Sequence, residues 1–103
     1  MNTFPADVAA AEAQFVTVTD DVLTVELTDG RSISVPISWY PRLVHGSAEE
    51  RHKWELLGGG VGIHWPGLEE DISVQGLLAG RRSGETQASL QRWLEGRRNR
   101  QPL

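Results

Sequence analysis

The sequence predicts one small α+β domain with a bent antiparallel sheet, formed by a three-stranded meander plus a short extra strand, one or two short helices and a C-terminal helix. Three observations predict this class. Apolar and polar residues alternate over residues 14–37, which is typical of half-buried strands. A Ser-x-x-Glu pattern at residues 47–50 indicates the start of a helix. Apolar residues in the segment 86–96 recur at helical spacing.

The predicted meander is centred on the pair Asp29-Gly30. Apolar residues alternate with polar ones on both sides of this pair: Leu23, Val25 and Leu27 before it, and Ile33, Val35 and Ile37 after it. Such alternation around Asp-Gly is the strongest short-range signal of a β-hairpin. Phe15 opens a further short strand before the hairpin. Pro36 cannot donate to a strand ladder and marks the end of the last strand or a sheet edge.

The next segment is expected to leave the sheet and form a short helix. Residues 38–43 indicate a turn or a single helical turn, because Pro41 restricts the residue before it. With Ser47 as N-cap and Glu50 three residues further on, a helix is predicted from Ala48 to about Trp54.

A second short region is then expected to return to the sheet. Three glycines at residues 58–60 interrupt any regular element. Residues 61–65 are predicted to form the short extra strand, which Pro66-Gly67 ends. Residues 69–71 are expected to form an acidic loop or a helix start, and residues 72–78 to supply apolar side chains to the core.

The last part of the chain is predicted to hold a linker and one helix. Residues 81–85 are polar and resemble a linker, and Gly96 is expected to end the helix that follows. The expected organisation has three parts: a flexible leader over residues 1–13, the α+β domain over residues 14–80, and the linker with its Arg-rich helix over residues 81–103.

Charge is distributed unevenly along the chain. The net charge is −4, but residues 1–74 carry four basic and twelve acidic side chains, a net charge of −8. Residues 75–103 carry six arginines and two glutamates, a net charge of +4. Two interpretations stay open: the basic end binds an acidic partner, or it folds back on its own acidic body. The second is slightly favoured.

Composition excludes several classes of protein. The 103 residues suffice for one modest core. The absence of Cys excludes a disulfide framework and a thiolate metal site. The N-terminus lacks the basic start of a signal peptide, and no apolar run approaches the ~18 residues of a membrane span. A cytoplasmic protein without membrane association is therefore expected.

No metal site or cofactor is predicted. His45, Glu49 and His52 would share a face if one helix carried all three, as ligands of a metal do. The capping box that begins at Ser47 places His45 outside that helix. The glycine-rich run at residues 58–62 lacks the Lys-Ser/Thr of a phosphate-binding loop.

No catalytic residue is predicted either. His64 lies close in sequence to Glu69, Glu70 and Asp71, and a histidine beside carboxylates is able to act as a general base. Because no Ser, Thr or Cys stands out as a nucleophile, a histidine that hydrogen-bonds a neighbouring loop is favoured over an enzyme built on His64.

The candidate partner-binding residues lie on the C-terminal helix: Leu90, Trp93, Leu94, Arg97 and Arg98. The other three tryptophans fall within core segments and are expected to pack there. If the helix docks on its own domain, Trp93 anchors it. If it does not, the apolar stripe lies exposed beside arginines. That arrangement suits a helix-in-groove contact with another protein or, through the arginines, nucleic acid.

Several stretches within residues 14–80 match a known family. They are Leu23-x-Val25-x-Leu27-x-Asp29-Gly30-Arg31, Trp39-Tyr40-Pro41-Arg42-Leu43, Ala48-Glu49-Glu50-Arg51 with Trp54, Gly60-Val61-Gly62-Ile63-His64-Trp65-Pro66, Leu68 to Ser73, and Gly76-Leu77-Leu78. Together they resemble the bacterial domain-of-unknown-function family 2442, which usually has Asp where Glu69 stands here. The run ending in Ile63-His64-Trp65-Pro66 is the most specific part.

The resemblance implies a small α+β fold and assigns no activity or catalytic residue. Members of the family are often encoded beside a second small protein, and the pair looks like a toxin–antitoxin module. The expected function is therefore a non-enzymatic protein-interaction module, the antitoxin-like member of a bacterial two-gene pair, with another small protein as its partner. The alternative is a nucleic-acid-binding or regulatory protein that acts through the Arg-rich C-terminal segment.

Overall fold

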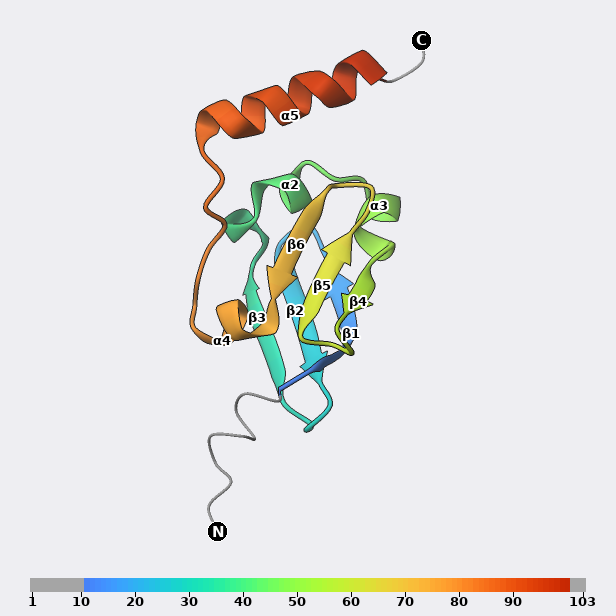
Figure 1. Ribbon diagram of the computed structural model, residues 1–103, viewed down its shortest axis with the longest axis vertical. Coiled ribbons are helices and arrows are strands. Elements are labelled where there is room, and N and C mark those ends of the chain that lie inside the picture. The colour runs from blue at the N-terminus through green and yellow to red at the C-terminus, as the bar shows by residue number, and fades with distance from the viewer. Residues whose placement is uncertain (1–10, 101–103) are drawn as a thin grey trace.

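A computed structural model describes residues 11–100 of the chain (Figure 1). It confirms the predicted α+β class, with two three-stranded antiparallel sheets, several short helices and a C-terminal helix. Residues 1–10, which make up most of the predicted leader, lie outside the described residues, as do residues 101–103. Within the described residues, no helix is long and apolar enough to cross a membrane.

The first sheet is the predicted meander. Its strands are β1 (Ala13–Val18), β2 (Val22–Leu27) and β3 (Ser32–Pro36), in the order β1-β2-β3. Leu23 lies opposite Val35, and Val25 lies opposite Ile33. This register gathers the alternating apolar side chains on one face. In the turn, Gly30 has a φ of 96°, a conformation that side chains disfavour.

The ordered domain starts earlier than the predicted boundary at residue 14. β1 begins at Ala13, whose side chain is buried. The Ala13 N–H donates to the Gly60 carbonyl at 2.7 Å, and the Glu12 carbonyl accepts the Thr28 N–H at 2.9 Å. These backbone hydrogen bonds tie residues 12 and 13 to both sheets.

The second sheet contains the predicted extra strand and two strands that were not predicted. It consists of β4 (Glu55–Leu57), β5 (Gly62–Trp65) and β6 (Glu70–Ser73), in the order β4-β5-β6. β4 has three residues, which is too few for a recognisable alternation. β6 falls partly in the segment expected to be an acidic loop. Ile72 is its buried residue, so polar composition obscured the strand.

Short helices connect and flank the sheets: η1 (Ile37–Trp39), α2 (Pro41–Val44), α3 (Ala48–His52) and α4 (Val74–Leu78). The capping box of α3 is confirmed. The Ser47 hydroxyl accepts the Glu50 N–H at 3.0 Å, and the Glu50 carboxylate accepts the Ser47 N–H at 2.9 Å. α3 ends two residues earlier than predicted, because Lys53 leaves the helical region and Trp54 packs edge-on against Phe15.

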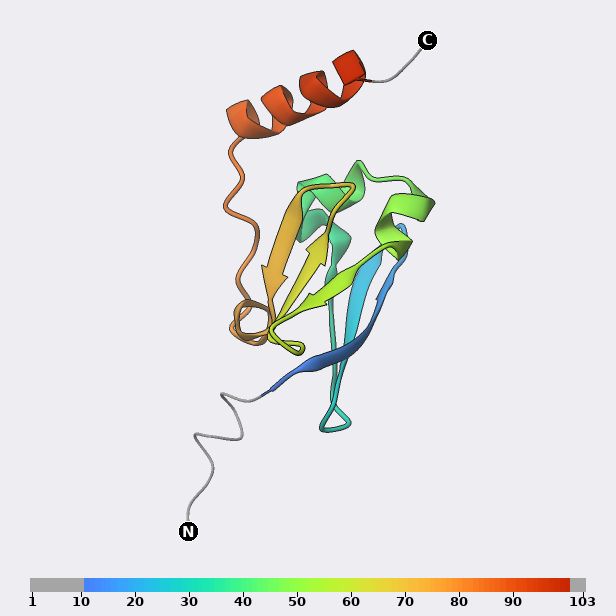
Figure 2. The same ribbon diagram turned by 45° about the vertical axis from the view of Figure 1, so that its right-hand side comes forward.

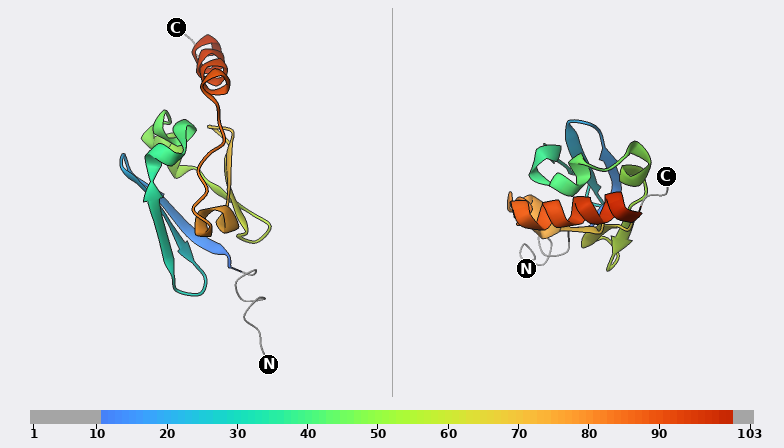
Figure 3. Two further views of the ribbon diagram at one scale, coloured as in Figure 1. Left: turned by 90° about the vertical axis from the view of Figure 1, so that its left-hand side faces the viewer. Right: turned by 90° about the horizontal axis from the view of Figure 1, so that it is seen from above.

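The core lies between the two sheets, which face each other as two layers (Figures 2 and 3). Leu23 and Val25 of β2 and Ile63 and Trp65 of β5 are fully buried. The Trp65 indole N–H donates to the Arg51 carbonyl at 3.1 Å, so this buried donor has a partner. Trp65 therefore packs in the core as expected.

The C-terminal helix α5 (Gln87–Arg100) crosses the end of the domain that carries α2 and α3 (Figures 1 and 3). α5 continues through Gly96, which was expected to end it. A glycine inside a helix costs about 1 kcal/mol. The side chain of the next residue, Arg97, donates hydrogen bonds to the Glu50 carboxylate in the body of the domain.

Candidate functional site

The segment before α5, predicted to be a linker, is attached along its length to the domain formed by residues 13–80, which we call the body. The Tyr40 hydroxyl donates to the Arg81 carbonyl at 2.8 Å, and the Ser83 N–H donates to the Trp39 carbonyl at 3.0 Å. The Arg82 guanidinium lies 5.0 Å from the centre of the Trp39 ring, within range of a cation–π contact. We call residues 81–85 the strap.

The strap ends in a bidentate ion pair between Arg42 of α2 and Glu85. Both nitrogen–oxygen distances are 2.8 Å, and the two side chains are 19% and 7% exposed. The guanidinium holds the pKa of Glu85 below its usual range, and Glu85 raises the pKa of Arg42. Glu85 also accepts the Ser89 hydroxyl at 2.7 Å. The carboxylate therefore joins α2 to the first turn of α5.

Trp93 anchors α5 on the body. Its side chain is 7% exposed, and its ring centre lies 5.0 Å from the Arg42 guanidinium and 4.7 Å from the Arg97 guanidinium. The indole N–H donates to the Glu69 carboxylate at 3.1 Å. An indole that is buried usually finds such a partner.

Glu69 holds this anchor from a backbone conformation that is rare for residues other than glycine. Its φ is 53°, in the left-handed region. Its backbone carbonyl accepts a hydrogen bond from the Arg42 guanidinium at 3.0 Å, and its carboxylate accepts the hydrogen bond from the Trp93 indole. Residues held in this way occur preferentially at functional sites.

Arg97 makes the second contact between α5 and the body. Its guanidinium donates to both oxygens of Glu50, at 2.9 and 3.1 Å, and to the Gly67 carbonyl at 3.2 Å. Arg97 lowers the pKa of Glu50, whose carboxylate also caps α3. The body therefore recognises a guanidinium with one carboxylate and one carbonyl.

The structure answers one question that the sequence left open, because α5 docks on its own domain. Of the candidate partner-binding residues, Trp93 is buried and Arg97 is ion-paired within the chain. Leu90 and Leu94 are half-buried against the core, and Arg98 is exposed. Binding of a partner by these five residues stays a prediction.

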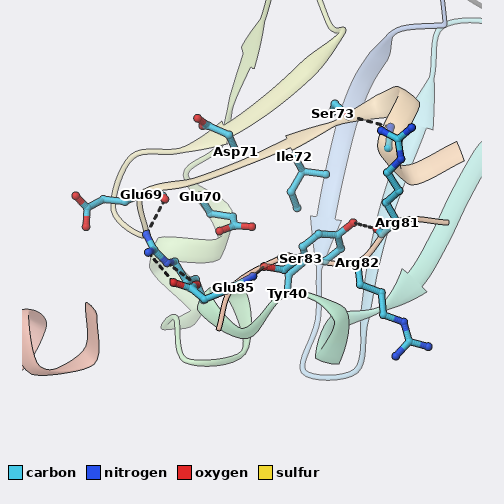
Figure 4. Close-up of a pocket in the computed structure, with 13 residues that line it drawn as sticks. Tyr40, Glu69, Glu70, Asp71, Ile72, Ser73, Arg81, Arg82, Ser83 and Glu85 are labelled. Atoms are coloured by element: carbon cyan, nitrogen blue, oxygen red, sulfur yellow. Dashed lines mark hydrogen bonds and ion pairs between the residues drawn. The ribbon is translucent and has the colours of Figure 1, made fainter. Parts of the chain in front are cut away.

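A pocket of about 410 Å³ lies between the strap and β6 (Figure 4). Glu70 lines it from one side of β6, while Asp71 points to the other side. Burial raises the pKa of Glu70 to about 7, against the opposing effect of Arg42. Burial and the charge of Glu70 raise the pKa of Tyr40. Glu70 therefore gives the pocket a carboxyl group that gains or loses its proton near neutral pH.

His64 lies away from this pocket. The imidazole Nδ1 contacts the Asp71 carboxylate across β5 and β6, where the two residues are directly paired. The other two carboxylates considered as partners of His64 lie elsewhere. Glu69 contacts Trp93, and Glu70 faces the pocket. The structure thus joins His64 to one of the three candidate carboxylates.

The sequence signals for metal and phosphate binding have structural explanations. No cluster of three or more metal-ligating side chains occurs within residues 11–100. His45 lies at the end of α2 rather than in α3. In the glycine-rich turn, a Cβ on Gly60 would lie 2.6 Å from the Ala13 carbonyl oxygen, so this close approach requires glycine.

The sequence reasoning singled out Trp93 and Arg97 on α5 but missed the residues outside the helix that hold it. Arg42, Glu50 and Glu69 lie in the body, and Glu85 lies in the segment considered a linker. Their partners are 24 to 47 positions away in the chain. The opposite charges of the body and the C-terminal segment were the available signal.

Comparison with known proteins finds one family and two similar structures. The model of a family described as "Protein of unknown function (DUF2442)" matches residues 13–83. None of the curated proteins gives a significant match. The family match therefore includes the body and the start of the strap, and it excludes Glu85 and α5.

The similar structures are both of bacterial proteins. The crystal structure of a protein of unknown function from Rhodospirillum rubrum is 29% identical, with a TM-score of 0.61, and the match covers 76% of this chain and 94% of that chain. The NMR structure of an uncharacterized protein from Chromobacterium violaceum is 20% identical, with a TM-score of 0.63, and the match covers 94% and 93%. The second likeness shows the fold and extends past residue 83.

Proposed function

This chain belongs to the DUF2442 family, and we propose that it is a non-enzymatic protein-interaction module, the antitoxin-like member of a bacterial two-gene pair. The partner would be another small protein that binds the stripe of Leu90, Trp93 and Leu94 on α5, with Arg97 and Arg98 beside it. The observation that carries the proposal is the way α5 docks, with Trp93 between two guanidiniums. The two-gene assignment itself derives from the family resemblance.

The contacts of α5 with the body suit exchange for another surface. The polar contacts that Trp93 and Arg97 make with the body come from their side chains. Arg97 and Glu50 are 20% and 27% exposed, so solvent weakens their attraction. A partner groove that buries the half-exposed Leu90 and Leu94 would gain apolar contacts that the body does not supply.

Docking on the body would also control partner binding. Tryptophan and arginine are the residues that most often dominate the energy of an interface, and here both are occupied within the chain. The apparent affinity for a partner is reduced by the fraction of molecules in which α5 is docked. Changes that undock α5 should therefore increase partner binding.

The experiment compares a variant that is expected to bind the partner more tightly, Glu69→Ala, with the double variant Leu90→Ala and Leu94→Ala, which is expected to bind it more weakly. Glu69→Ala removes the acceptor of the Trp93 indole without changing the stripe, and Glu26→Ala, an exposed acid on β2, is the matched control. Tagged proteins are purified from the native host, and one co-purifying small protein is identified by mass spectrometry and titrated against each variant.

Glu69→Ala should bind this partner more tightly than the wild type, and Leu90→Ala with Leu94→Ala more weakly. Equal affinity for the wild type and the double variant would refute the role of the stripe.

The alternative is nucleic-acid binding through the C-terminal arginines. Arg92 and Arg98 are exposed on α5, which favours this reading, whereas Arg97 is engaged by Glu50. A gel-shift assay at two salt concentrations separates the two functions. Phosphate-driven affinity falls with a log–log slope of about −0.9 per contact. Absence of a shift at low salt would rule out this alternative.

A further inference from the structure

We propose that a groove between α3, the start of β4 and the Pro66-Gly67 turn binds an arginine side chain from a basic segment of a partner protein. The groove has a volume of about 570 Å³, and its lining consists of Glu49, Glu50, Lys53, Trp54, Glu55, Pro66 and Gly67. This surface belongs to the body, so the inference goes beyond the binding proposed for α5.

The charge of the groove favours a cationic ligand. Three carboxylates line it against one ammonium group, and one of the three, that of Glu50, is already paired with Arg97. Glu49 pairs with Lys53 at 3.2 Å, but both side chains are more than two-thirds exposed, so this pair is easily exchanged. Glu55 is exposed at the first position of β4. The groove also lies in the part of the chain that carries a net charge of −8.

Trp54 supplies an aromatic surface for a guanidinium. Its ring is half-buried, lines the groove and is braced by Phe15 in an edge-on contact with ring centres 5.5 Å apart. Trp39 has Arg82 over its ring, and Trp93 has Arg42 and Arg97. Trp65 is fully buried in the core. Within residues 11–100, Trp54 is thus the partly exposed tryptophan without a stacked guanidinium.

The wall of the groove already binds one guanidinium. Glu50 and Gly67 line the groove, and both accept hydrogen bonds from Arg97. The Glu50 carboxylate and the Gly67 carbonyl therefore show the recognition chemistry that this surface offers. A second guanidinium, from a partner, would find Glu49, Glu55 and the Trp54 ring beside the first.

A basic segment fits the groove better than a second copy of this chain does. The body of a second copy would bring its own acidic surface against the three glutamates, and like charges repel. In a second copy, Arg82 and Arg97 are already engaged within their own chain. Arginine is preferred over lysine because its planar group both pairs with carboxylates and stacks on aromatic rings.

The test is an NMR titration of the full chain with a tetra-arginine peptide amide at low salt. The indole N–H signal of Trp54, identified by its loss in Trp54→Phe, reports directly on the groove. We expect a saturable shift of this signal and a Kd at least threefold higher for tetra-lysine. Glu55→Gln should raise the Kd for tetra-arginine at least threefold, and the control Glu26→Gln should leave it unchanged.

Three results would overturn the inference. The first is a Trp54 signal that does not move. The second is an equal effect of Glu55→Gln and Glu26→Gln, which would indicate diffuse attraction to the acidic body. The third is concentration-dependent dimerisation without peptide that Glu55→Gln abolishes, which would make a second copy the occupant. The Trp54 signal reports on the groove and not on partner binding by α5, so this inference and the role of α5 fail separately.

Discussion

Arg42 and Glu85 lie 43 positions apart in the chain and form a two-pronged ion pair with both distances at 2.8 Å. The same guanidinium donates to the Glu69 carbonyl and stacks on Trp93. Arg42 therefore links α2, the turn before β6, the strap and α5. Because Arg42 belongs to the matched family region and Glu85 does not, the pair joins the family domain to its C-terminal extension.

Replacing Arg42 should destabilise the protein and loosen the strap. Arg42→Ala removes three charge-assisted hydrogen bonds and leaves the Glu85 carboxylate without its partner, so we expect a loss of about 1–3 kcal/mol in the free energy of unfolding. Urea denaturation followed by circular dichroism measures this loss. Arg31→Ala is the matched control, because Arg31 pairs with Asp29 at 2.8 Å on the open surface. Equal stabilities of the two variants would contradict the special role of Arg42.

Glu70 should make stability fall between mildly acidic and neutral pH. Burial raises the pKa of Glu70 from an ordinary 4.5 to about 7. Between these values the folded protein binds more protons than the unfolded chain, so the free energy of unfolding decreases as pH rises. Glu70→Gln should be more stable than the wild type by about 1–3 kcal/mol at pH 8, a range that allows for partial solvation.

The measurement is urea denaturation of both proteins from pH 3 to pH 8. The difference should vanish near pH 4. Arginine partners lower the pKa values of Glu50 and Glu85 in the folded state. The stability that these two carboxylates contribute is therefore lost as the pH falls below the ordinary pKa of a glutamate, and it should be lost equally in the wild type and in Glu70→Gln. A constant difference across the whole range would show that Glu70 does not titrate as stated.

The hairpin around Asp29-Gly30 and the capping box of α3 were predictable because the information that specifies them is local. Both depend on residues no more than a few positions apart. β4 and β6 were not predictable, because β4 has three residues and β6 is mostly polar. Both strands are defined by pairing with β5 rather than by their own pattern.

The docking of α5 was beyond sequence reasoning for a different physical reason. The sequence showed an apolar stripe with Trp93 at its centre, and it showed opposite charges in the body and the C-terminal segment. It did not show that Glu69 and Glu50 would receive Trp93 and Arg97. Those contacts follow from how the second sheet is placed.

Two glycines should respond in opposite ways to alanine. At Gly60, φ is 121° and a Cβ would lie 2.6 Å from the Ala13 carbonyl oxygen, so Gly60→Ala should destabilise the protein by about 1–3 kcal/mol. At Gly84, in the strap, a Cβ would meet open space, and Gly84→Ala should be neutral or stabilising by up to about 1 kcal/mol. Thermal unfolding of both variants checks the contrast, and a Gly60→Ala variant as stable as Gly84→Ala would contradict it.

Trp93→Phe should loosen α5 while leaving the body intact. Phenylalanine keeps an aromatic ring between Arg42 and Arg97 but removes the donor to Glu69. A hydrogen bond to a carboxylate contributes about 1.5–3 kcal/mol, so backbone amides of α5 should exchange with deuterium at least tenfold faster. Mass spectrometry of peptides from α5 and β2 measures both regions in one sample. Exchange in β2 should be unchanged, and acceleration in β2 as well would mean that Trp93 stabilises the whole fold rather than the docking of its helix.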